Sequence, residues 1–108
     1  MRDNQNLKEL LVDLKSELTK LYGHRFIKLI LYGSHARSEE TIDSDIDIAV
    51  VLKGDIVPGV EIDNMVQVIT DLDLKYGELI SVFPVSENNF LNLKSPLLIN
   101  VRREGVSV

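Results

Sequence analysis

The sequence is organised around two segments, YGSHARS at Tyr32–Ser38 and DSDIDIAVVL at Asp43–Leu52. In the second segment, Asp45 and Asp47 open an apolar strand. Side chains two positions apart on a strand point to the same face, so both carboxylates are expected to face one spot. Adjacent carboxylates repel each other and are costly to desolvate, so a fold rarely keeps such a pair without a cation. Oxygen ligands alone favour a hard divalent ion such as Mg²⁺.

The first segment supplies the other half of the predicted site. A glycine at a strand end, here Gly33, lets backbone N–H groups approach a phosphate closely. The hydroxyl of Ser34 and the start of a short helical turn expected after it can hold that phosphate. Arg37 lies one turn further on, where its guanidinium group can reach the same phosphates. The alternative for Arg37 is a surface ion pair with Glu39 or Glu40.

A Gly-Ser turn alone is a weak signal. The pair followed, after residues 35–44, by D-x-D at the head of an apolar strand is far more specific. This combination resembles the nucleotidyltransferase superfamily that includes DNA polymerase β and kanamycin nucleotidyltransferase. The similarity is strongest to its smallest members, the minimal nucleotidyltransferase (MNT) antitoxins of HEPN–MNT toxin–antitoxin pairs, and it extends over nearly the whole chain.

The resemblance implies an α/β (α+β) fold, a small mixed β-sheet with helices packed on it, forming one domain over residues 1–108. It also implies transfer of AMP from ATP to a tyrosine of a partner HEPN ribonuclease toxin, with Mg²⁺ as cofactor. By the same resemblance, Gly33, Ser34 and Arg37 would bind the triphosphate. Asp45 and Asp47 would be the catalytic and metal-binding residues.

The sequence departs from the family pattern at Ser81. Catalytic members carry a third carboxylate on the strand after the second helix, where it binds the metal nearest the attacking hydroxyl. Aligning residues 80–83 with that strand puts Ser81 in the place of the acid, and serine is a neutral, poor ligand for Mg²⁺. A phenolic acceptor, with a pKa near about 10, needs less activation than an aliphatic alcohol. Two hypotheses stay open: an adenylyltransferase with an impaired second-metal position, and an antitoxin that neutralises the HEPN toxin by binding alone.

Composition narrows the alternatives. The 108 residues leave no room for the second domain with which small-molecule nucleotidyltransferases close over their acceptor. The net charge of −5 argues against a general nucleic-acid binder, so the expected partner is the toxin, in a hetero-oligomer. There are no cysteines for disulfides or thiolate metal sites. No apolar run approaches the roughly 20 residues of a membrane span, and the N-terminal residues lack the apolar core of a signal peptide. We therefore expect a cytoplasmic protein.

Apolar periodicity and Gly, Pro and Ser signals predict the elements. Pro84 cannot donate to a ladder, which places it at the end of a strand or at the edge of the sheet. Pro58-Gly59 is expected to belong to a loop. In chain order, the predicted elements are a helix capped by Asn4 or Asn6 with its apolar face from Leu7 to Leu21 and ended by Gly23, strand Phe26–Tyr32, strand Asp45–Leu52, a helix over Ile62–Tyr76 ended by Gly77, strand Glu78–Val85, and helix Leu97–Arg103 between Ser95 and Gly105.

Overall fold

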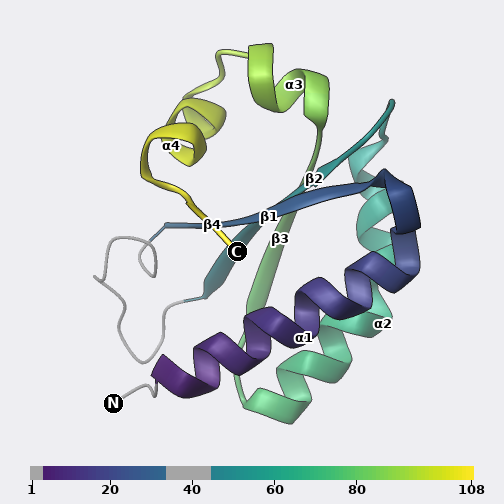
Figure 1. Cartoon of the computed structure of the whole chain (residues 1–108), viewed down its shortest axis with the longest axis vertical. Coiled ribbons are helices and arrows are strands. Elements are labelled where there is room, and N and C mark those ends of the chain that lie inside the picture. Colours follow the sequence, from purple (N-terminus) through teal and green to yellow (C-terminus); the bar gives the residue numbers. More distant parts are fainter. Residues whose placement is uncertain (1–3, 34–44) are drawn as a thin grey trace.

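The computed structural model describes residues 4–33 and 45–108 (Figure 1). Within these ranges the strands form one four-stranded sheet in the order β3-β2-β1-β4. Strands β2 and β3 are parallel, and the other pairs are antiparallel. The expected mixed sheet with helices packed on it is therefore confirmed. The elements are α1 (Asn4–Tyr22), the 3₁₀ turn η1 (Gly23–Arg25), β1 (Phe26–Tyr32), β2 (Ile46–Leu52), α2 (Pro58–Tyr76), β3 (Ile80–Ser86), α3 (Glu87–Asn92), α4 (Pro96–Glu104) and β4 (Val106–Ser107).

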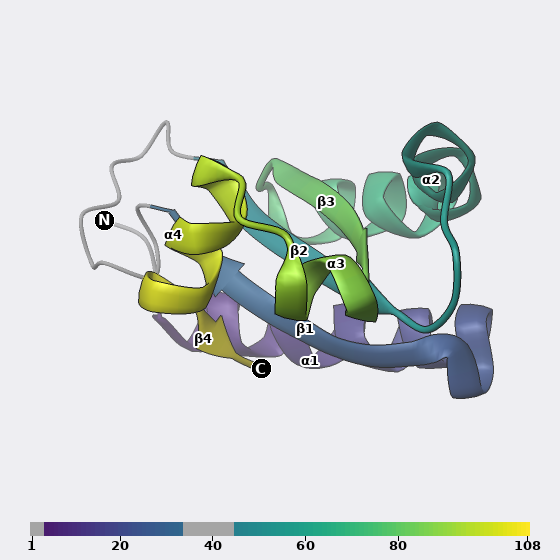
Figure 2. The same cartoon turned by 90° about the horizontal axis from the view of Figure 1, so that it is seen from above.

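Helices cover both faces of the sheet. In Figure 1, α3 and α4 lie above the sheet and α1 and α2 lie below it, and Figure 2 shows the same arrangement from the side of α3 and α4. Leu29 and Ile48 pack into a core with α1 and α2. Ile30 and Val51 point the other way and pack into a second core with α3 and α4. Burial on both faces explains the continuous apolar runs of β1 and β2. Across the described ranges, no helix combines the length and apolar character needed to cross a membrane.

Helix α1 follows the predicted leucine stripe over most of its length. Leu10, Leu14 and Leu18 are fully buried, and each contributes roughly 2 kcal/mol by leaving water. The prediction was wrong for Leu21, which is 44% exposed. The stripe continues instead to Tyr22, four residues after Leu18, as helical spacing requires. The cap prediction for Asn6 was also wrong, because Asn6 lies inside α1 and its amide donates to the carbonyl of Tyr76 at 3.5 Å.

Helix α2 begins earlier than predicted, at Pro58, because proline is well suited to the first helical position. The loop predicted at Pro58-Gly59 is therefore wrong. Helical spacing predicts an apolar, buried side that includes Ile62 and Val66, but these two residues are 42% and 56% exposed. The helix ends as predicted at Gly77, which has a left-handed conformation with φ +67°.

The C-terminal third contains the least predictable elements. Neither α3 nor the short β4, which pairs with β1, was predicted from the sequence. The cap of α4 was predicted correctly, because Ser95 Oγ accepts the N–H of Leu98 at 3.2 Å. Strand β3 begins at Ile80, two residues later than expected, and lies at the edge of the sheet, where Pro84 is tolerated.

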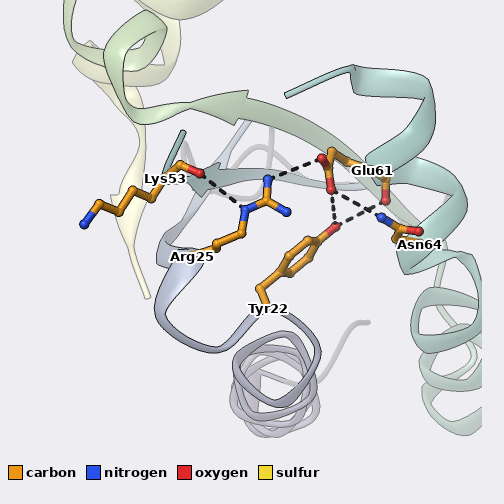
Figure 3. A network of polar contacts seen from close by, with 5 residues as sticks. All are labelled: Tyr22, Arg25, Lys53, Glu61 and Asn64. Carbon is orange, nitrogen blue, oxygen red and sulfur yellow. Dashed lines mark hydrogen bonds and ion pairs between the residues drawn. The ribbon is translucent and has the colours of Figure 1, made fainter. Parts of the chain in front are cut away.

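A buried acid joins α1, η1 and α2 at the end of the sheet remote from the start of β2. Glu61 is only 5% exposed. Figure 3 shows its carboxylate between Tyr22, whose hydroxyl donates at 3.0 Å, and Arg25, whose Nη2 lies at 3.4 Å. Asn64 adds a longer hydrogen bond at 3.5 Å, and Arg25 Nε donates to the carbonyl of Lys53 at 3.4 Å. Burial, with the hydrogen bond to Glu61, raises the pKa of Tyr22 to about 12, so its hydroxyl stays a donor at neutral pH.

Replacing Glu61 by alanine is expected to destabilise the fold. The change leaves the Tyr22 hydroxyl without its acceptor and removes the buried partner of Arg25. We expect Glu61→Ala to lower the free energy of unfolding by about 2–3 kcal/mol. Asp63→Ala, two residues along the same helix at an exposed position, should cost less than about 0.5 kcal/mol. Urea unfolding followed by circular dichroism measures both values. Equal losses in the two variants would show that the network does not stabilise the fold.

Candidate functional site

The predicted carboxylates lie at the start of the central strand β2. Asp45 immediately precedes the strand and is exposed, and Asp47 is half-buried within it. Ile46 and Ile48 are fully buried on the opposite face, against α1 and α2. The expected alternation of one chemical face and one core face is therefore present at this end of β2. The chemical face is the one that α3 and α4 cover further along, because Val51 packs there.

Asp47 lies in a row with one residue from each neighbouring strand. It pairs with Tyr32 across the antiparallel β1–β2 ladder and with Ser81 across the parallel β2–β3 ladder. Residues paired in adjacent strands share a face, so the three side chains lie side by side on the chemical face. Burial, together with the charge of Asp47, raises the pKa of Tyr32, which keeps its phenol neutral. Ser81 is exposed, so its hydroxyl faces the open side of this row.

Gly33 approaches Asp47 more closely than any other residue type could. Its φ of +73° lies in the left-handed region, which side chains rarely adopt. A Cβ atom built on Gly33 would lie 2.3 Å from Asp47 Oδ2. The glycine thus leaves room for the carboxylate beside the chain that leads toward Ser34. Ser34 and Arg37, the other predicted phosphate-binding residues, lie outside the described residues.

Asp73 in α2 lies close to this end of the sheet, and the sequence did not single it out. Its Oδ1 accepts the N–H of Ile80, the first residue of β3, at 3.0 Å. Burial and the charge of Asp45 raise the pKa of Asp73, while the hydrogen bond from Ile80 lowers it. The signal that could have revealed Asp73 is its place one turn before the helix-ending Gly77, where a short acid can reach the next strand.

The donor set at the head of β2 fits one hard divalent cation. Asp45 and Asp47 offer only oxygen ligands, and the missing Cβ at Gly33 leaves space beside one of them. Within residues 4–33 and 45–108, no group of three or more His, Cys, Asp or Glu side chains could hold a metal ion. Two carboxylates would therefore need further oxygens from phosphates and water, which is how Mg²⁺ is commonly bound.

Comparisons with known proteins agree on the fold and on the class of chemistry. The family model described as "Polymerase beta, Nucleotidyltransferase" matches residues 13–105. A protein of Methanocaldococcus jannaschii named "Putative protein adenylyltransferase" is 40% identical over 90 residues, which cover 83% of this chain and 80% of that protein. A solved structure titled "Structure of putative minimal nucleotidyltransferase" superposes with a TM-score of 0.66. It is 23% identical, with 99% of this chain and 97% of that chain covered, so it supports the fold alone.

Gly33→Ala is expected to damage the site more than the fold. The left-handed backbone costs an alanine roughly 1–2 kcal/mol, and its Cβ forces the Asp47 carboxylate to rotate away. Gly54→Ala is the matched control, because Gly54 has φ +85° with no atom within 4 Å of an added Cβ. Both variants should lose similar stability, whereas only Gly33→Ala should weaken Mn²⁺ binding, by roughly tenfold or more. Electron paramagnetic resonance of free Mn²⁺ measures the affinity. Unchanged Mn²⁺ binding in Gly33→Ala would contradict the role assigned to this close approach.

Proposed function

Because this chain belongs to the polymerase β nucleotidyltransferase family, we propose that it is a protein adenylyltransferase whose target is a tyrosine of a HEPN ribonuclease toxin. The observation that carries the proposal is the pair Asp45 and Asp47 at the head of the central strand, with Gly33 against Asp47. The relative named as a putative protein adenylyltransferase supports AMP as the transferred group and a protein as the acceptor. The HEPN toxin as target rests on the resemblance to minimal nucleotidyltransferase antitoxins, which act in the cytoplasm where ATP is available.

The residues of the site have separate roles in the transfer. Gly33 and Ser34 hold the triphosphate through backbone N–H groups and a hydroxyl, and Arg37 adds a fork of donors. Asp45 and Asp47 hold Mg²⁺, which neutralises charge on the phosphates when bound. The tyrosine oxygen then forms a bond to the α-phosphorus, the bond from this phosphorus to the bridging oxygen breaks, and pyrophosphate leaves. Nucleotidyl transfer depends mainly on such positioning, so the rigid central strand suits it.

Ser81 decides how efficient this chemistry can be. It lies beside Asp47 on the edge strand, in the register position where we place the third carboxylate of catalytic relatives. A hydroxyl there neither binds a second cation strongly nor takes a proton at neutral pH. The phenolic proton of the acceptor tyrosine would then pass to water. We therefore expect a slow transferase directed at a relatively acidic acceptor.

A second candidate function follows from the same residue. Without a third acid, the chain can neutralise its toxin by contact alone, which requires an exposed apolar surface. Two places on the described surface meet that requirement. Ile62 and Val66 lie one turn apart on α2, and Leu91, Leu93 and Leu97 are exposed around the connection from α3 to α4.

The intact mass of a HEPN toxin encoded beside this chain separates the two functions. After incubation with the protein, ATP and Mg²⁺, the toxin should gain the mass of one or more AMP groups. The double variant Asp45→Asn with Asp47→Asn should abolish the gain, because the cation loses both carboxylates. Ser81→Asp should increase the rate of transfer by supplying the acid beside Asp47.

A control on complex formation makes the result decisive. Wild type and the double variant should form the same complex with the toxin on size-exclusion chromatography, so that loss of transfer is not loss of docking. No mass gain with either wild type or Ser81→Asp, while ribonuclease activity remains blocked in the complex, would overturn the transferase and establish the binding-only antitoxin.

A further inference from the structure

The Asp73 carboxylate is built into the junction that places β3 beside the carboxylate pair. Ile80, which donates to Asp73 Oδ1, pairs in register with Ile46 at the head of β2. The N–H of Ile46 in turn donates to the carbonyl of Leu79 at 2.8 Å. Two successive hydrogen bonds therefore link the Asp73 carboxylate to the residue that follows Asp45.

The backbone of Asp73 also fixes the end of α2. Its carbonyl accepts the N–H groups of Gly77 at 2.9 Å and Glu78 at 3.2 Å. Side chain and carbonyl together hold both ends of the connection from α2 to β3, so the position of the carboxylate is determined by the fold. The bond from Ile80 favours the ionised form of the acid. The charge of Asp45 contributes to the raised pKa of Asp73, which indicates that the two carboxylates lie within electrostatic range of each other.

We propose that Asp73 is a positioning residue for the cation site, whose negative charge strengthens divalent-cation binding at Asp45 and Asp47 without touching the ion. Asp73 on α2 thereby replaces part of the negative charge that is missing at the neutral Ser81 on β3. The proposal rests on the proposed function, because it assumes a cation at the carboxylate pair. Direct ligation is not part of it, since within the described residues three acids do not come together as a ligand set. A negative charge held nearby attracts a divalent cation without contacting it, by a Coulomb interaction that is weakened less in a partly desolvated site than in water.

Variants of Asp73 separate its charge from its hydrogen bond. Asp73→Asn keeps an oxygen acceptor for Ile80 and removes the charge, whereas Asp73→Glu keeps the charge and displaces the acceptor. Asp71→Asn is the matched control, because Asp71 is an exposed acid on the same helix whose side chain contacts Gln67 instead. Mn²⁺ affinity is measured by electron paramagnetic resonance, and stability by urea unfolding, on the full chain. Asp73→Ser, with a smaller neutral acceptor, serves if Asp73→Asn does not fold.

The expected result is a split between the two measurements. Asp73→Asn should bind Mn²⁺ roughly threefold to tenfold more weakly at nearly unchanged stability. Asp73→Glu should retain Mn²⁺ affinity and lose stability, and Asp71→Asn should change neither. The proposal is overturned if Asp73→Asn binds Mn²⁺ like wild type, or if Asp71→Asn weakens binding equally. If wild type does not bind Mn²⁺, or binds it with an affinity that Asp45→Asn leaves unchanged, the cation site is overturned and with it the proposed function.

Discussion

Strand β2 pairs with an antiparallel neighbour on one side and a parallel neighbour on the other, and the site depends on the register of both ladders at Asp47. An antiparallel neighbour brings Tyr32 and, one residue later, Gly33 to one side of the carboxylate. A parallel neighbour brings Ser81 to the other side. A slip of one residue in either ladder would turn Asp47 into the core under α1 and α2. The fully buried Ile46 and Ile48 oppose such a slip, so hydrophobic burial fixes the position of the chemical groups.

The two ends of the sheet are specialised differently. At the start of β2, Asp45 is exposed and Asp47 is half-buried, and the missing Cβ at Gly33 leaves room for the Asp47 carboxylate. At the other end, the buried Glu61 is surrounded by donors from three elements and has no opening to a ligand. Placing the stabilising network far from the carboxylate pair lets the fold tolerate repulsion between Asp45 and Asp47.

The sequence predicted those features that local physics determines. Strand Phe26–Tyr32, the capping by Ser95 and the helix stop at Gly77 follow from apolar runs and from the conformations of single residues. Burial of Glu61 could not be predicted, because its partners Tyr22 and Arg25 come from a distant part of the chain. The exposure of Ile62 could not be predicted from helical spacing either, because contacts with distant parts of the chain decide which side of the helix is buried. The shared face of Asp45 and Asp47 could be predicted from the alternation of side chains along a strand. The position of Asp73 near this pair could not, because it depends on the parallel register of β3.

A crystal structure of the protein with Mn²⁺ and a non-hydrolysable ATP analogue would show whether the head of β2 binds a metal–nucleotide complex, with the metal located by its anomalous scattering. We expect one Mn²⁺ ion held by the carboxylates of Asp45 and Asp47, on the face of the sheet that α3 and α4 share. We also expect the triphosphate to lie against Gly33, with Ser81 too far from the ion to bind it. A metal ion held elsewhere, or a nucleotide bound away from the head of β2, would rule out this site.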